Sequence, residues 1–154
     1  MPPLADAIAA RAAGRAGDTL SVWGWAPEYN VETGLMPATR DAIGHYVISE
    51  SPPRNYFRNR YLNDLAKNRP ALFIDAVSEK NFHWTWSLDQ THESFPELDK
   101  FIEDNYALWQ SIPETNQVRQ GRPVRIYVLK ERLPALEHIP TNWNISTNPV
   151  FEAP

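Results

Sequence analysis

Two short apolar segments constrain the fold of this 154-residue chain more than any other feature. Thr19–Trp25 and Ala71–Val77 are almost continuous apolar runs, the pattern of strands that are buried on both faces of a sheet. Each run follows a segment with helical periodicity, Leu4–Ala13 before the first and Tyr56–Lys67 before the second. Alternating helices and buried strands favour a parallel sheet with right-handed crossovers. We therefore expect the two runs to be adjacent, parallel, central strands of a three-layer α/β sandwich with a mostly parallel sheet.

The second half of the chain predicts an antiparallel hairpin at the edge of that sheet. Ala107–Ile112 and Val124–Leu129 are strand-like, and the polar residues between them form a turn. A helix is predicted before them at Phe95–Tyr106, where Pro96 suits the first turn. Residues 1–139 are therefore expected to form a single α/β domain, followed by an irregular tail over residues 140–154.

Shorter elements are predicted between these. They are a short helix from Pro27 to Gly34, a strand at Ala38–Arg40, an irregular segment at Asp41–Pro53, and one or two helical turns at Leu133–His138. On the helix Tyr56–Lys67, the apolar face consists of Phe57, Tyr61 and Leu65. The same periodicity predicts that Arg58, Asn59 and Asp64 face outward.

Composition and charge exclude several classes of function. The chain has no Cys, which excludes disulfides and thiolate metal sites. Its net charge of −4 argues against nucleic acid or acidic lipid as a partner, because such partners require a basic face. No apolar run approaches the roughly 20 residues that cross a bilayer, and the charges of Asp6 and Arg11 argue against a signal peptide. Taken alone, these features are typical of a cytoplasmic protein.

No sequence motif names a reaction or a cofactor. The chain lacks a dinucleotide fingerprint, a phosphate-binding P-loop, a Gly-x-Ser-x-Gly nucleophile motif and a Cys nucleophile, so we expect no cofactor. His83, Asp89, His92 and Glu93 lie close together in the sequence, but their spacing matches no common metal-ligand pattern. We therefore expect no metal site.

The most distinctive string of residues lies between the first apolar run and the following extended segment. Two Trp flank Gly24 and are followed by Ala-Pro-Glu-Tyr, and the string Gly-Leu-Met-Pro-Ala-Thr-Arg then ends at Arg40. These residues resemble a signature near the C-terminus of bacterial membrane glycosyltransferases. Those multispanning enzymes use lipid-phosphate sugars and are similar to protein mannosyltransferases and aminoarabinose transferases. The resemblance covers Leu4 to about Val77.

The resemblance implies that the chain is the soluble, extracytoplasmic (periplasmic) C-terminal domain of such a glycosyltransferase. The catalytic carboxylates of that family lie in loops between membrane helices, so the chain should transfer no sugar alone. Its implied partners are the membrane domain of the same polypeptide and a lipid-linked sugar or glycan acceptor, with no nucleic acid. The alternative is a freestanding soluble α/β domain that binds carbohydrate or another protein. A third reading is a hydrolase that uses Glu28 and Asp75 as paired carboxylates.

Ligands of open α/β sheets bind beyond the carboxyl ends of the strands, and this rule selects Trp25, Glu28, Tyr29 and Asp75 as candidate binding residues. Trp23 and Trp25 are two apart on a predicted strand and should share a face. They either pack beneath a helix or form a platform for a sugar or lipid.

Glu28, Asp75 and Arg40 are the charged candidates, and the first two have two readings each. Glu28 is either a site carboxylate or the ion-pair partner of Arg40. We expect the Arg40 guanidinium to contact an acid or several backbone carbonyls near the carboxyl end of the first strand, with Glu28 or Asp75 favoured. Asp75 either caps the turn after its strand or is buried and paired with Arg40 or Arg54.

The long loop Ser78–Ser94 contributes the last candidates. Phe82, Trp84 and Trp86 alternate along it, so in an extended segment they share one face. They either pack on the edge of the sheet or expose an apolar patch, in which case Trp84 and Trp86 would contact glycan or the membrane interface.

Overall fold

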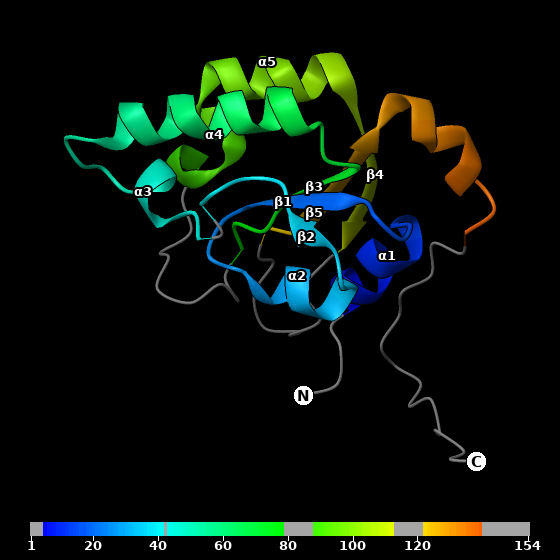
Figure 1. Ribbon diagram of the computed structural model, residues 1–154. Coiled ribbons are helices and arrows are strands. Elements are labelled where there is room, and N and C mark those ends of the chain that lie inside the picture. The colour runs from blue at the N-terminus through cyan, green and yellow to red at the C-terminus, as the bar shows by residue number, and fades with distance from the viewer. Residues whose placement is uncertain (1–4, 42, 79–87, 113–121, 140–154) are drawn as a thin grey trace.

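The computed structural model describes residues 5–41, 43–78, 88–112 and 122–139. Its described part is built around a five-stranded sheet whose strand order is β2-β1-β3-β5-β4, with helices on both sides (Figure 1). The elements, where η denotes a 3₁₀-helix, are α1 (Ala5–Ala13), β1 (Thr19–Trp23), α2 (Glu28–Thr33), β2 (Met36–Pro37), α3 (His45–Ile48), α4 (Arg54–Asn68), β3 (Leu72–Asp75), η1 (Leu88–Gln90), η2 (His92–Ser94), α5 (Pro96–Asn105), β4 (Tyr106–Ile112), β5 (Val124–Leu129) and η3 (Lys130–Leu136).

The sheet has the predicted mixed topology. β1 and β3 are parallel neighbours inside the sheet, and β2 pairs in parallel with the other side of β1. β5 pairs antiparallel with both β3 and β4, so the hairpin β4–β5 closes one edge. The α/β fold class, the parallel central pair and the antiparallel edge hairpin are therefore confirmed.

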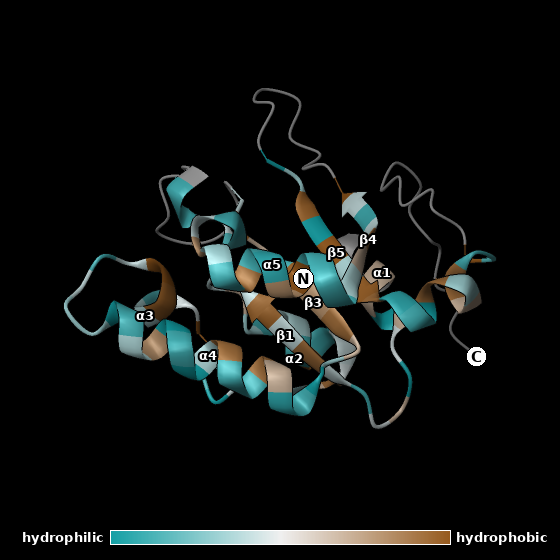
Figure 2. Ribbon diagram, turned by 90° about the horizontal axis from the view of Figure 1, so that it is seen from above, coloured by the Kyte–Doolittle hydropathy of each residue, from teal (hydrophilic) through white to brown (hydrophobic). Residues whose placement is uncertain are grey.

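The two central strands are buried on both faces, as their apolar composition predicts. In β1, Leu20 and Val22 belong to the core beneath α1 and α2, while Trp23 belongs to the core beneath α4 and α5. β3 divides in the same way, with Ile74 in the first core and Phe73 in the second. Figure 1 shows the sheet edge-on between these helix layers, and Figure 2 shows brown strands beneath the largely teal α4. Burying each such large apolar side chain stabilises the fold by about 1.5–3 kcal/mol.

A buried hydroxyl pair fixes α4 over β1. The Tyr61 hydroxyl lies 2.6 Å from the Ser21 hydroxyl and donates to the carbonyl of Val22 at 3.1 Å. Burial raises the pKa of Tyr61, so the phenol stays protonated and keeps its donor. The helix ends at Asn68, and the next residue, Arg69, takes a left-handed conformation (φ +40°) ahead of Pro70.

Two predicted boundaries are wrong. The segment predicted to be irregular contains α3, whose residues Val47 and Ile48 join the core beneath α4. The second strand lies at Met36–Pro37, ahead of the predicted Ala38–Arg40. Tail residues 140–154 lie outside the described residues, and their predicted irregularity stays a prediction.

The predicted outward face of α4 is also wrong for Arg58 and Asp64, which are buried, whereas Asn59 is exposed. The Arg58 guanidinium donates to the carbonyl of Val47 at 2.8 Å and to the carbonyl of Ser94 at 3.2 Å. Burial lowers the pKa of Arg58, but an arginine remains charged under all ordinary conditions. Helical periodicity failed here because segments far away in the sequence cover the polar flanks of α4.

Candidate functional site

The Trp-Gly-Trp string forms a tight junction of three backbone segments at the end of β1. Gly24 has φ +133°, and a Cβ added there would lie 3.3 Å from the carbonyl carbon of Ala76. A Cβ on Gly44 would lie 2.6 Å from the carbonyl oxygen of Gly24, which accepts a hydrogen bond from the Gly44 amide at 2.9 Å. Both positions therefore require glycine, the first for its backbone conformation and both for the close approach.

This turn places the two Trp of the string in different surroundings. Trp23 is fully buried, packs edge-on against Tyr61 and donates from its indole nitrogen to the carbonyl of Gln90 at 2.8 Å. Trp25 lies beyond the strand, is half-buried and meets the ring of His45. The predicted strand does not reach Trp25, because β1 ends at Trp23 and Gly24 redirects the chain, so the two Trp do not lie two apart on one strand. The packing interpretation is confirmed for Trp23.

The next two candidate residues differ in exposure. Glu28 is exposed and opens α2, where its charge interacts favourably with the helix dipole. Tyr29 is buried in the core beneath α2, so its ring is unavailable to a ligand in this conformation. Gly34 ends the helix in a left-handed conformation (φ +71°), as its sequence position predicts.

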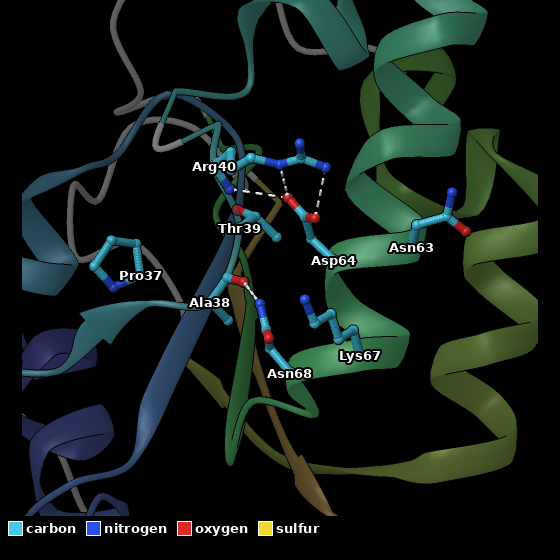
Figure 3. A pocket seen from close by; sticks show the side chains of 8 residues that line it. All are labelled: Pro37, Ala38, Thr39, Arg40, Asn63, Asp64, Lys67 and Asn68. Carbon is cyan, nitrogen blue, oxygen red and sulfur yellow. Dashed lines mark hydrogen bonds and ion pairs between the residues drawn. The ribbon is translucent and has the colours of Figure 1, made fainter.

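The second part of the distinctive string forms one wall of an open cavity of about 510 Å³, which we call the motif cavity (Figure 3). Its wall from the string consists of Pro37, Ala38, Thr39 and Arg40, and its wall from α4 consists of Asn63, Asp64, Lys67 and Asn68. Asn68 joins the two walls, since its side-chain amide donates to the carbonyl of Ala38 at 2.6 Å.

Arg40 holds Asp64 through three hydrogen bonds. The Asp64 carboxylate accepts from the backbone amide of Arg40 at 3.1 Å, from its Nε at 3.0 Å and from its Nη2 at 2.9 Å. These bonds lower the pKa of Asp64 and raise that of Arg40. Arg40 thus contacts an acid, as predicted, but the acid is Asp64 of α4 rather than Glu28 or Asp75.

The remaining polar groups of the motif cavity are open to a ligand. Arg40 keeps 67% of its side chain exposed although it is ion-paired, so one edge of the guanidinium faces solvent. Asn63 and Lys67 are exposed, and within the described residues neither side chain has a hydrogen bond or an ion pair. The cavity therefore combines a fixed guanidinium–carboxylate pair, a flexible cation and an amide.

A second polar cluster, the Asp75 network, surrounds the end of β3. Asp75 is fully buried, and its Oδ1 accepts from the amide of Val77 at 3.1 Å, which is the predicted turn cap. Its Oδ2 contacts Nδ1 of His92 at 2.6 Å and Nη2 of Arg122 at 3.0 Å. Arg125, which is paired with Asp75 in the β3–β5 register, approaches at 3.4 Å. The prediction of Arg40 or Arg54 as partner is therefore wrong.

Glu93 completes the Asp75 network. It accepts hydrogen bonds from both Arg122 and Arg125, so two guanidiniums are shared between two carboxylates. Ligand atoms of Asp75, His92 and Glu93 lie within 4.8 Å of one another, a proximity that the spacing along the loop could not reveal because Asp75 comes from β3. A cation at this point would have to displace two guanidiniums from the carboxylates that they neutralise.

The structure does not bring the predicted site residues together into one site. Arg40 belongs to the motif cavity and Asp75 to the buried network, while Trp25 and Glu28 lie at the turn after β1. Trp84 and Trp86, with Phe82 and His83, lie outside the described residues, and their roles stay predictions. Sequence reasoning missed Asn63, Asp64, Lys67 and Asn68, although their i, i+4 spacing on one helix could have indicated a common polar face.

In the described part of the chain, no helix is both long enough and apolar enough to cross a membrane. Comparison of the chain with protein-family models, with curated proteins and with solved structures found no match in any of the three.

Proposed function

We propose that this chain is the extracytoplasmic, non-catalytic domain of a membrane glycosyltransferase that uses a lipid-phosphate sugar donor. In this proposal the motif cavity holds the polar part of the donor or the acceptor. One observation carries the proposal: four consecutive residues of the glycosyltransferase-like string, Pro37 to Arg40, form a wall of the motif cavity. The string thus supplies more than a turn, because it also forms one wall of an open polar cavity.

The chemistry of the motif cavity suits a sugar or sugar phosphate. Sugar hydroxyls both donate and accept, so they pair well with planar amides, carboxylates and guanidiniums held in fixed positions. The pair Arg40–Asp64 is such a fixed group, and Asn63 adds an amide. Lys67 adds a cation that suits a phosphate or another anion.

The surroundings of Asp75 support a non-catalytic role over the hydrolase reading. A glycosidase requires two carboxyl groups that reach the same glycosidic bond. Asp75 is fully buried, and both of its oxygens accept hydrogen bonds from protein groups. Glu28 is exposed and lies on α2. In this conformation Asp75 cannot reach a sugar. Asp75 is therefore unavailable as the second carboxyl group that the hydrolase would need beside Glu28.

Ligand titration followed by NMR tests the binding role of the motif cavity. The isotope-labelled chain is titrated with a hexose 1-phosphate and, separately, with a neutral disaccharide. We expect the amide signals of Thr39, Arg40 and Asn68 to shift with at least one of these probes. Lys67→Ala should weaken binding of the phosphate, while Lys100→Ala, which removes an exposed cation from α5, should not.

Each outcome of the titration has a clear meaning. Shifts confined to other surfaces, or a response that survives Asn63→Ala combined with Lys67→Ala, would contradict the binding role. Turnover of a lipid-linked sugar by this chain alone would contradict the non-catalytic role. The reading frame of the gene tests the membrane assignment separately, because we expect about 8–12 apolar segments of about 20 residues upstream. A frame without them favours a freestanding carbohydrate-binding or protein-interaction domain.

A further inference from the structure

A second cavity, which we call the helix cavity, lies between the first half of α4 and the start of α5. It has a volume of about 260 Å³. It is lined by Asn55, Arg58 and Asn59 of α4, by Phe95, and by Pro96 and Glu97 of α5. Figure 1 shows both helices on the same side of the sheet. The helix cavity shares no lining residue with the motif cavity, so the two cavities can be tested separately.

Arg58 is a buried cation in the wall of the helix cavity. Its exposed fraction is 8%, and its guanidinium donates to neutral acceptors, which are the carbonyls of Val47 and Ser94 and, at 3.3 Å, the hydroxyl of Ser94. Within the described residues it has no ion-pair partner. A buried charge is costly unless an opposite charge pairs with it. A guanidinium also has more N–H donors than these three bonds use. Arg58 therefore offers an anionic group both an unpaired charge and unused donors.

Glu97 lies in the same wall but does not pair with Arg58. Burial lowers the pKa of Arg58, and the negative charge of Glu97 opposes this effect without a direct contact. The rings of Phe95 and Trp23 lie 5.1 Å and 6.0 Å from Cζ of Arg58, and such cation–π contacts replace hydration only in part. The helix cavity therefore has a cation and an anion in its wall that do not neutralise each other by contact.

Two side-chain amides complete the polar wall of the helix cavity. Asn55 and Asn59 are one helical turn apart on α4 and therefore lie on the same face of the helix. Both residues are exposed, and in the part of the chain that the structure describes neither side chain has a hydrogen bond. An amide both donates and accepts, so each of them can bind an anionic or a cationic group of a ligand.

We propose that the helix cavity binds a small zwitterion, a molecule that carries a carboxylate and an ammonium group close together, as a free amino acid does. The carboxylate pairs with Arg58 and supplies the counter-ion that this buried guanidinium lacks within the described residues. The ammonium group pairs with Glu97. A simple anion fits less well because Glu97 repels it, and a simple cation fits less well because Arg58 repels it.

This inference goes beyond the proposed function and holds whether or not the motif cavity binds a sugar. The α4 residues of the helix cavity end at Asn59, whereas those of the motif cavity begin at Asn63. A hexose 1-phosphate and a neutral disaccharide both lack an ammonium group, so neither is the ligand that the helix cavity fits.

NMR titration of the isotope-labelled chain at neutral pH tests the helix cavity directly. The probes are glycine as the zwitterion, acetate as the anion alone and methylammonium as the cation alone. We expect glycine to shift the amide signals of Asn55, Asn59 and Glu97 and to leave those of Thr39 and Arg40 in place. Its dissociation constant should be about tenfold lower than that of acetate or of methylammonium.

Variants of exposed residues separate binding from folding. Glu97→Gln should weaken glycine binding by about tenfold without weakening acetate binding, so that the preference for glycine is lost. Glu103→Gln is its matched control, because Glu103 is an exposed acid on the same helix. Asn55→Ala combined with Asn59→Ala should also weaken glycine binding, whereas Asn63→Ala, which alters only the motif cavity, should not.

Arg58→Gln should abolish the response to glycine. If that variant fails to fold, the Glu97 and Asn variants still decide the question. Equal dissociation constants for glycine and acetate in the parent chain would overturn the proposal. So would an unchanged preference in Glu97→Gln, or glycine-induced shifts that are absent or confined to other surfaces. None of these outcomes bears on sugar binding by the motif cavity, which is read from the signals of Thr39 and Arg40.

Discussion

Asp64 and Asp75 both accept hydrogen bonds from arginine, yet their surroundings differ in access to solvent. The partner of Asp64 is Arg40, whose side chain is 67% exposed at the open motif cavity. The partners of Asp75 include Arg122, whose side chain is only 9% exposed, and Asp75 itself is fully buried. Similar chemical groups thus form an accessible polar surface in one place and a closed internal network in the other.

The difference teaches which of the two sites is suited to a ligand. Water reaches the exposed guanidinium of Arg40 and screens its charge, so this guanidinium can also contact a ligand. A buried carboxylate depends on its partners, because losing one of them leaves a charge without solvation. The comparison therefore favours the motif cavity over the Asp75 network as the place of the proposed ligand, and it favours a structural role for the Asp75 network.

The largest expected effect is the loss of the buried charge. Asp75→Asn keeps the size of the side chain but removes the charge that Arg122 and Arg125 neutralise. We expect a decrease of about 3–5 kcal/mol in the free energy of unfolding, measured by urea denaturation. Asp104→Asn is the control, because Asp104 is exposed and its carboxylate, among the described residues, pairs only with Lys100 on the same helix. Equal stability of the two variants would contradict the structural role of Asp75.

The junction between the two regions should give the next largest effect. A Cβ on Gly44 would meet the backbone of Gly24, and Gly24 itself packs against Ala76, the residue after Asp75. Gly44→Ala should therefore lower the free energy of unfolding by about 1–3 kcal/mol, because backbone atoms must move apart. Gly14→Ala is the matched control, since the close contact of its Cβ is with the end of the Leu35 side chain, while the nearest backbone atom, the carbonyl oxygen of Ala10, lies at an ordinary 3.5 Å. An effect of Gly44→Ala no larger than that of the control would argue against a rigid junction.

Asp64→Ala should have a smaller effect, and one that depends on pH. Removing the acceptor of three hydrogen bonds from Arg40 should lower the free energy of unfolding by about 1–2 kcal/mol at neutral pH. Because the pKa of Asp64 is lowered in the folded chain, its contribution is complete above the unfolded pKa of about 3.9. The contribution is lost as the pH falls through the lower, folded pKa.

Urea denaturation of both chains between neutral and acidic pH measures this dependence. The difference in stability between the parent and Asp64→Ala should be constant at neutral pH and should shrink in acid. The free energy of unfolding of Arg40→Lys should lie between that of the parent and that of Asp64→Ala, because an ammonium keeps the charge but cannot reproduce the bidentate contact. A difference that grows as the pH falls would have the wrong sign for this ion pair.

The sequence predicted the parts of the fold that depend on local pattern. β1 and β3 are continuous apolar runs, and the helices before them have clear periodicity, so their pairing and central position followed. The hairpin β4–β5 followed from two strand-like segments and the turn between them.

The partners of the charged residues were not predictable, because they depend on contacts between distant segments. Arg125 meets Asp75 only through the register of β3 and β5, and the two are 50 residues apart in the sequence. Asp64 looked like a solvent-facing helix residue until the segment after β2 was placed beside α4. The motif cavity has one wall of each kind. The wall from the string was identified in the sequence, whereas the four α4 residues of the opposite wall were not, because they meet the string only in the folded chain.

The smallest expected effect on stability is that of Lys67→Ala. Its comparison with Arg122→Ala tests the difference between the motif cavity and the Asp75 network most directly. Both variants remove one cation. Lys67 is exposed and, among the described residues, has no ion-pair partner, so its loss should change the free energy of unfolding by less than about 0.5 kcal/mol. Arg122 contacts both Asp75 and Glu93, and its loss leaves a buried carboxylate with fewer partners, so it should be several-fold more destabilising.

Urea denaturation of Lys67→Ala and Arg122→Ala under the same conditions measures the two changes in the free energy of unfolding. A large loss of stability in Lys67→Ala would mean that the motif cavity is held together by Lys67 and is not open to a ligand. A negligible loss in Arg122→Ala would mean that the Asp75 network tolerates the removal of a cation, and the network rather than the motif cavity would then become the place where a charged ligand can replace a protein group.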